Sequence, residues 1–196
     1  MSSSKRLTEE QGELLLLLAR MTIARRLGID VSVKPAPDFQ KKMADPAFAE
    51  RHGTFVTLKQ RNMLRGCIGC LTPSESIVEG VKRNALNAAF NDNRFMPVTN
   101  DEYDDLQIEV SILTEPQGLS YDSADDLLRK LRPGIDGVIL KKGYASATFL
   151  PQVWEQLPRP EDFLAHLCMK AGLPADAWKT GNLEISTYQV QKFEEA

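Results

Sequence analysis

Cysteine is scarce in this sequence, with three residues in a chain of 196. Two of them, Cys67 and Cys70, are close neighbours, so the thiols make a poor disulfide framework and suit a reducing compartment. A membrane-spanning run of about 20 apolar residues is also missing. The longest apolar run, residues 14–19, has Glu13 before it and Arg20 after it, which indicates the buried face of a helix.

A secretory leader is not indicated either, because polar residues 8–13 separate the basic start of the chain from its leucines. We therefore expect a cytoplasmic protein without a membrane partner. The net charge of −3 argues against wrapping nucleic acid by bulk electrostatics, although it leaves room for a local basic patch. The length and the 42% of hydrophobic residues suffice for a core that buries roughly 70% of the unfolded surface.

Helix-start and helix-stop signals are clear at several places. Thr8 opens a capping box with Gln11, and Gly28 can end the first helix in a left-handed conformation. Thr72 precedes a proline and, three positions later, Glu75, which marks a second helix start. With the apolar periodicity, these signals predict an extended connector over 31–38 and helices over 8–28, 45–51 (a short piece), 72–91, 122–131 and 160–172.

Period-two alternation predicts strands over 54–59, 64–71, 106–112, 138–140, 145–150 and 183–190. The first two should pair as a β-hairpin, as should the fourth and fifth, and a shift in the last strand indicates a bulge near Ser186 and Thr187. Hairpins with single helices between them favour the α+β class, a mostly antiparallel sheet flanked by helices. Without a flexible linker or repeat, residues 1–196 should form a single domain in which any second lobe is integral.

The most informative stretch is residues 64–71, which reads Leu-Arg-Gly-Cys-Ile-Gly-Cys-Leu. Gly66 and Gly69 weaken a strand and give it nothing to pack, so they indicate bends or the close approach of a ligand or another backbone. We therefore expect residues 65–69 to form the wall of a binding site.

Within this stretch, Arg65 and Cys67 should point to the same face of the strand. A guanidinium beside a thiol favours the thiolate form, which a nucleophilic or redox cysteine needs. The alternative is structural: Cys67 is a small buried hydrophobic residue, and Arg65 pairs with a carboxylate.

Redox and metal chemistry are weaker interpretations of the cysteines. A thioredoxin-like pair sits at a helix N-terminus, whereas Cys67 and Cys70 precede the predicted helix and should face opposite sides of the strand. A zinc site would also need His166 and Cys168, which lie two apart on a helix and cannot face one metal. We therefore expect no metal site.

Glu109 occupies the polar face of an otherwise hydrophobic strand. It is either solvated there or faces a cleft as a general base or as a partner for Arg65 or Arg94. His52 precedes the first strand, where it can serve as a proton shuttle or simply end a helix. Four basic residues either form an anion-binding rim or lie on an ordinary solvated surface; they are Lys59, Arg61, Arg65 and Arg94.

Several short blocks of the chain fall in the order typical of the AMMECR1 domain family, which the chain resembles over nearly its whole length. The blocks are Phe-Val-Thr-Leu at 55–58, Leu-Arg-Gly-Cys-Ile-Gly at 64–69, Ala-Ala-Phe at 88–90, Arg-Phe at 94–95 with Pro97, the strand at 106–113, Thr-Phe-Leu-Pro-Gln-Val-Trp at 148–154, and residues 163–173. The resemblance implies an α+β fold with a larger and a smaller lobe and places the 65–69 motif near a cleft between them. It also implies association with a Memo-like protein and a radical-SAM protein. Cys70 and Ala147 depart from the pattern, so the Cys-x-x-Cys is peculiar to this chain.

The sequence leads to two hypotheses about function. In the first, the protein handles a small molecule in a cleft walled by residues 65–69, with Cys67 as nucleophile, Glu109 as base, His52 as proton shuttle and Arg65 or Arg94 holding an anion. In the second, the same motif is a non-catalytic surface that binds a protein or RNA partner. Neither hypothesis names a cofactor.

Overall fold

The computed structural model describes residues 6–30, 37–180 and 182–195. The chain folds as two compact units, one formed by Met1–Leu113 with Gln191–Ala196 and the other by Thr114–Val190. Helices and antiparallel strands make up both units, which confirms the α+β class. The predicted connector over 31–38 falls largely outside the described residues. No described helix is long and apolar enough to cross a membrane.

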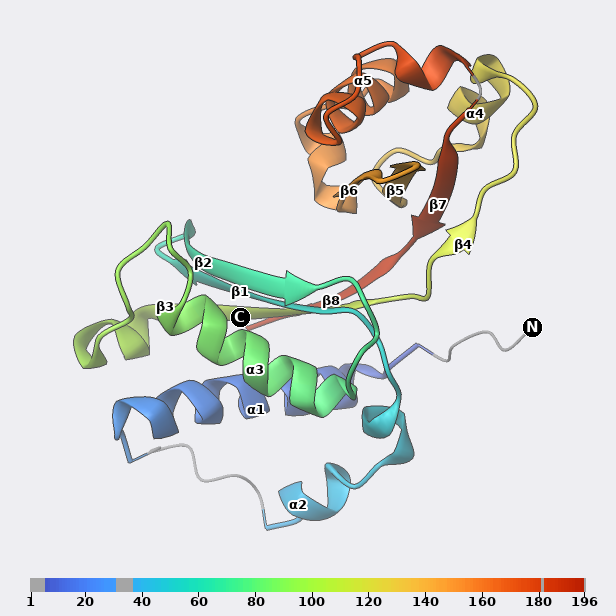
Figure 1. Ribbon diagram of the computed structural model, residues 1–196. Helices are drawn as coiled ribbons and strands as arrows, with labels where there is room; N and C mark the ends of the chain where they lie inside the picture. Colours follow the sequence, from blue (N-terminus) through green and yellow to red (C-terminus); the bar gives the residue numbers. More distant parts are fainter. Residues whose placement is uncertain (1–5, 31–36, 181, 196) are drawn as a thin grey trace. The chain divides into compact units, whose positions relative to one another are not determined.

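The first unit has a four-stranded sheet in the order β2-β1-β3-β8. Its strands are β1 (Thr54–Gln60), β2 (Met63–Cys70), β3 (Leu106–Leu113) and β8 (Val190–Glu194). Figure 1 shows α1 (Glu9–Leu27) and α3 (Ile77–Phe90) on one side of this sheet. The alternation in β1 and β3 buries Val56, Leu58, Ile108 and Val110 completely against these helices.

The predicted first hairpin is confirmed. Arg61 and Asn62 form its turn with φ angles of 51° and 63°, the left-handed backbone that a two-residue hairpin loop requires. The register of β1 against β2 shifts between Leu58 and Lys59, because Leu58 pairs with Gly66 and Lys59 pairs with Leu64. Arg65 is therefore the extra residue of a β-bulge.

The first helix is also confirmed. Thr8 accepts a hydrogen bond from the N–H of Gln11, the side chain of Gln11 caps Thr8 in return, and Gly28 ends α1 with a φ of 72°. The start of α3 was predicted four residues too early: its N-cap is Ser76 and not Thr72, and Ser76 accepts from the N–H of Glu79. The piece expected near 45–51 is the short 3-10 helix Pro46–Ala49, and α2 (Phe39–Lys42) was not foreseen.

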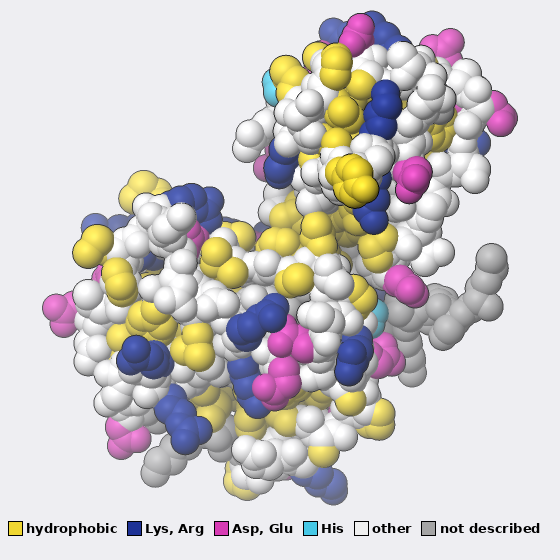
Figure 2. Space-filling model, viewed as in Figure 1, with side chains coloured by type: hydrophobic (Ala, Val, Ile, Leu, Met, Phe, Trp, Pro, Cys, Tyr) yellow, Lys and Arg dark blue, Asp and Glu magenta, His cyan; other side chains and the backbone are white. Residues whose placement is uncertain are grey.

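Between α3 and β3 lies a further 3-10 helix, Asn100–Asp105. Its capping box joins Thr99 and Glu102. Two ion pairs lie on the outer surface at α3 and just before it: Lys82–Glu79 and Arg83–Glu75. Figure 2 shows acidic and basic side chains side by side over this part of the first unit.

The second unit has its own sheet, in the order β4-β7-β5-β6. Its strands are β4 (Gln117–Gly118), β5 (Gly137–Lys142), β6 (Ala145–Phe149) and β7 (Glu184–Tyr188), and its helices are α4 (Ala124–Lys130), α5 (Pro160–Lys170) and the 3-10 helices Pro151–Glu155 and Ala177–Thr180. The predicted hairpin of β5 and β6 is confirmed. Trp154 stacks on Phe163 with ring centroids 3.7 Å apart, at the centre of the core of this unit.

The prediction of one final strand over 183–190 was wrong. β7 pairs with β5 without a register shift, so Ser186 and Thr187 form no bulge. The chain instead leaves this sheet after Tyr188 and re-enters the first unit as β8, beside β3. The change in inward pattern between Ile185 and Tyr188 therefore lies within β7, just before the chain changes sheets.

Candidate functional site

The polar side chains of the motif region gather on the face of the first sheet opposite α1 and α3, which we call the helix-free face. Gly66 faces the helices, because a Cβ atom there would overlap the carbonyl of Ala88 in α3. Side chains alternate along a strand, so the neighbours of Gly66 and Leu58 point the other way. The helix-free face carries Phe55, Thr57, Lys59, Cys67, Gly69, Gln107, Glu109, Lys192 and Glu194.

Cys67 lies directly opposite Thr57 in the pairing of β2 with β1. The Thr57 hydroxyl donates a hydrogen bond to the Cys67 sulfur over 3.3 Å. Cys67 is a free thiol of intermediate exposure, whereas Cys168 in the second unit is fully buried. The side chain that contacts the thiol is thus that of Thr57, a residue that was not predicted from the sequence to be part of the site.

The backbone of Cys67 is held from the outer edge of β2. Its N–H donates to Oδ2 of Asp92 over 2.9 Å, and Nη2 of Arg94 donates to its carbonyl over 3.2 Å. Arg94 also donates hydrogen bonds to the Asp92 carboxylate from Nε, over 2.9 Å, and from Nη2, over 2.6 Å. This pairing holds the pKa of Asp92 well below its usual range. Both backbone groups of an edge-strand residue are therefore satisfied by side chains, which holds the backbone that carries the thiol.

Arg94 was predicted to hold an anion, and the structure gives its guanidinium an internal carboxylate partner. Arg65 is likewise committed: Nε and Nη2 bind the carboxylate of Glu102 at 2.7 and 3.1 Å. These bonds from Arg65 lower the pKa of Glu102 to about 2. The Arg65 side chain is 13% exposed. Arg65 thus has a carboxylate partner within the fold, while its Nη1 is buried and has no hydrogen-bond partner among the described residues, and its role in binding a ligand stays a prediction.

Glu109 is 7% exposed and does not lie in solvent. Its carboxylate contacts Lys59 at 3.2 Å and Lys192 at 2.9 Å, and it raises the pKa of Lys192. Thr57 of β1 stands between Glu109 and Cys67, so their backbones are two strand spacings, about 9.5 Å, apart. The structure places Glu109 and Cys67 in one row across the sheet but does not bring the carboxylate to the thiol.

The two glycines of the motif have packing roles. Gly66 is buried beneath the carbonyl of Ala88, so the prediction that it contacts a ligand is corrected. Gly69 lies under the ring of Phe55, where a Cβ atom would overlap the ring carbons. The expected close approach is thus by a helix backbone in one case and by an aromatic ring in the other.

His52 lies at the far end of β1 from the thiol. Its Nδ1 is 2.9 Å from the carbonyl of Leu113, and its Nε2 is 3.2 Å from Glu50. Five residues of extended chain separate it from Thr57, which is about 16 Å. The proposed proton shuttle is therefore out of reach of Cys67 within this sheet.

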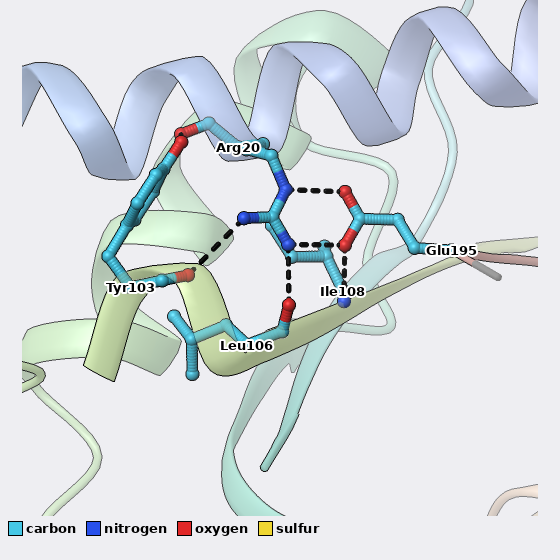
Figure 3. Close-up of polar contacts among 5 residues, drawn as sticks. All are labelled: Arg20, Tyr103, Leu106, Ile108 and Glu195. Atoms are coloured by element: carbon cyan, nitrogen blue, oxygen red, sulfur yellow. Dashed lines mark hydrogen bonds and ion pairs between the residues drawn. The ribbon is translucent and has the colours of Figure 1, made fainter. Parts of the chain in front are cut away.

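A second polar network lies at the start of β3 and was not predicted from the sequence (Figure 3). Arg20 of α1 binds both carboxylate oxygens of Glu195, at 2.7 and 2.6 Å, and donates to the carbonyls of Tyr103 and Leu106. Glu195 also accepts from the N–H of Ile108 over 2.9 Å. This network joins the first helix, the third strand and the end of the chain.

No group of three or more His, Cys, Asp or Glu side chains in residues 6–30, 37–180 and 182–195 is arranged to hold a metal ion. The chemistry that the helix-free face offers is that of one positioned thiol, its hydroxyl donor and a charge-balanced cluster; that cluster consists of Lys59, Glu109, Lys192 and Glu194.

Comparison with known proteins agrees with the sequence resemblance. A family model described as AMMECR1 matches residues 16–193. A protein of Methanothermobacter thermautotrophicus is 36% identical over 194 residues, covering 96% of this chain and 96% of the relative, and one of Methanosarcina mazei is 39% identical over 190 residues, covering 96% and 94%. The crystal structure of Pyrococcus horikoshii protein PH0010, titled as uncharacterized, matches with a TM-score of 0.80 at 37% identity, covering 96% of this chain and 93% of that one.

Proposed function

This chain belongs to the AMMECR1 family, and we propose that it handles a small electrophilic molecule at the wall formed by residues 65–69, with Cys67 as the nucleophile. One observation carries the proposal: the thiol accepts a hydrogen bond from Thr57, while its own backbone is held at both the N–H and the carbonyl by Asp92 and Arg94. A cysteine that only fills space needs no such positioning.

The neighbouring residues favour a reaction at sulfur over anion binding. Arg65 and Arg94 are paired with Glu102 and Asp92, so they do not form an open cationic rim. Glu109 is held between two lysines and acts in this proposal as a structural anion, not as the base for Cys67. The proton of the thiol is therefore released to solvent before the sulfur attacks.

The test uses p-nitrophenyl acetate as the electrophilic probe. Attack by the Cys67 sulfur on the ester carbonyl forms a thioester and releases p-nitrophenolate, which is measured by its absorbance. We expect a burst that approaches one equivalent per chain, with an acetyl group on Cys67 by mass spectrometry. The burst should disappear in Cys67→Ser and persist in Cys70→Ser, the matched thiol on the same strand. A burst that survives Cys67→Ser would refute the assignment.

A non-catalytic role is favoured by a different observation, the exposed apolar start of β2. Met63 is 68% exposed and Leu64 is 46% exposed, next to the hairpin turn. Exposed apolar residues beside an edge strand are typical of a partner-binding surface. The test uses a Memo-like protein, the partner that the family resemblance implies, in a calorimetric titration. Binding lost in Met63→Lys but kept in Cys67→Ser would support this role, and absence of binding would reject it for that partner.

A further inference from the structure

A separate groove opens between three helices of the first unit, on the side of the sheet away from Cys67. α1, α2 and α3 surround a cavity of about 1130 Å³, which is large enough for a drug-sized ligand. The part of its lining contributed by α1 recurs at helical spacing along one stripe: Leu18, Met21, Thr22 and Arg25. Ile29 and Asp30, which follow the helix, continue the lining. The groove therefore exists because α1, α2 and α3 do not pack fully against one another here.

The floor of the groove is apolar. Phe39 of α2 is 4% exposed and anchors the floor in the core of the unit. Around it, side chains that are only partly buried pack against the same core: Met21, Ile29, Met43 and Val78. Flexible methionines adapt to ligands of varied shape, so this floor suits a hydrocarbon chain.

The rim of the groove carries an excess of positive charge. Arg25, Arg26 and Lys82 line it, against one acid, Asp30. Lys82 contacts Glu79 in an exposed pair, whereas Arg25 and Arg26 form no ion pair with any residue of 6–30, 37–180 or 182–195. The undescribed positions include no Asp or Glu. The dipole of α1 explains basic residues in its last turn, but it does not explain the apolar floor beside them.

We propose that this groove binds a single-chain amphipathic carboxylate, such as a fatty acid, with its hydrocarbon tail on the apolar floor and its head group at Arg25 and Lys82. Charge complementarity selects the anion, because two cations border the apolar surface: Arg25, which has no carboxylate partner among the described residues, and Lys82, whose pair with Glu79 is exposed. Arg26 lies over the ring of Phe90 and adds positive charge to the same rim. This site is independent of the proposed thiol chemistry, since its residues come from the opposite side of the sheet.

The experiment titrates the full chain with cis-parinaric acid, a fluorescent fatty acid, and with its uncharged methyl ester. We expect saturable binding of the acid and weaker binding of the ester. The double variant Arg25→Gln/Lys82→Gln should weaken the binding of the acid by about tenfold and leave the affinity for the ester unchanged. Ala44→Trp, which places an indole in the groove from an exposed position, should abolish both. Lys41→Gln on α2 does not line the groove and serves as the matched control.

Several results would overturn the proposal. These are absence of saturable binding, equal affinity of acid and ester, or binding that survives Ala44→Trp. Tighter binding in Val31→Ser/Val33→Ser would assign the groove to the chain's own residues 31–36. Sedimentation that shows a dimer disrupted by Ala44→Trp would assign it to a second copy. Loss of parinarate binding in Cys67→Ser would contradict the independence of the two sites. The burst experiment on Cys67 tests the proposed thiol chemistry separately, so either proposal can fail while the other stands.

Discussion

The Thr57 hydroxyl donates a hydrogen bond to the Cys67 sulfur across two paired strands, over 3.3 Å. In this sheet it is therefore a threonine of the neighbouring strand, and not Arg65 of the same strand, that directly contacts the thiol.

Replacing Thr57 with valine keeps the shape of the side chain and removes the donor. Since one such bond contributes about 1 kcal/mol, the rate of alkylation of Cys67 by iodoacetamide at neutral pH should fall by about fivefold. Thr57→Ser should retain most of the rate. Peptide mass spectrometry follows Cys67 and Cys70 in the same sample, so Cys70 is the internal control. Equal rates in wild type and Thr57→Val would show that the bond does not activate the thiol.

Local signals predicted those parts of the fold that depend on a few adjacent residues. The capping box at Thr8 and the left-handed Gly28 define α1 because both act within one helical turn. The hairpin of β1 and β2 follows from alternation and a two-residue turn. By contrast, Thr72 and Ser76 have the same capping chemistry, and the choice of Ser76 depends on tertiary contacts such as the bond from Ile77 N–H to the carbonyl of Glu50.

The faces of single strands could be predicted from the sequence, but the relation between strands could not. Period two predicted that Cys67 shares a face with Gly69 and that Glu109 lies on the polar face of its own strand. It predicted neither that Cys67 and Glu109 lie in one row across the sheet nor that Arg65, expected beside Cys67, is the extra residue of a bulge. The partners of Arg65 and Cys67 were hidden because Glu102 and Asp92 lie 37 and 25 positions along the chain. Contacts of that sequence separation have no local signature.

The close approach of Gly66 to α3 predicts a large cost for any side chain at that position. Gly66→Ala would force its Cβ against the Ala88 carbonyl. The carbonyl is a backbone group and the backbone fixes the position of the Cβ atom, so neither can rotate away. We expect destabilisation of about 1–3 kcal/mol by urea unfolding. Gly118→Ala is the matched control, because nothing lies within 4 Å of the added atom. Equal stability of the two variants would contradict the tight packing of α3 on β2.

The Arg20–Glu195 pair should contribute strongly to the first unit. Glu195→Gln breaks a two-point ion pair, with side chains 18% and 22% exposed, and weakens the bond to the Ile108 N–H. We expect a loss of about 2–3 kcal/mol. Both tryptophans, Trp154 and Trp178, lie in the second unit, so far-UV circular dichroism should show an earlier transition while tryptophan fluorescence does not.

The control for this prediction is Glu161→Gln, which removes an exposed carboxylate 3.9 Å from Arg159. Surface pairs of this kind contribute about 0–1 kcal/mol, so its unfolding curve should match the wild type. A Glu195→Gln variant as stable as Glu161→Gln would mean that the end of the chain is not needed to hold α1 and β3 together.

Acid should weaken the first unit through the carboxylate of Glu102. Its pKa is about 2 in the folded chain because Arg65 donates two hydrogen bonds, against about 4.3 in an unfolded chain. A folded pKa below the unfolded one contributes stability that is present above pH 4.3 and is lost as the pH falls towards 2. Allowing for partial solvent exposure, the loss is about 2 kcal/mol. In urea unfolding followed by circular dichroism from pH 7 to pH 2.5, Glu102→Gln and Arg65→Met should both be less stable at pH 7 and lose less on acidification. Wild-type and variant curves that stay parallel across this range would show that the Arg65–Glu102 pair does not stabilise the fold.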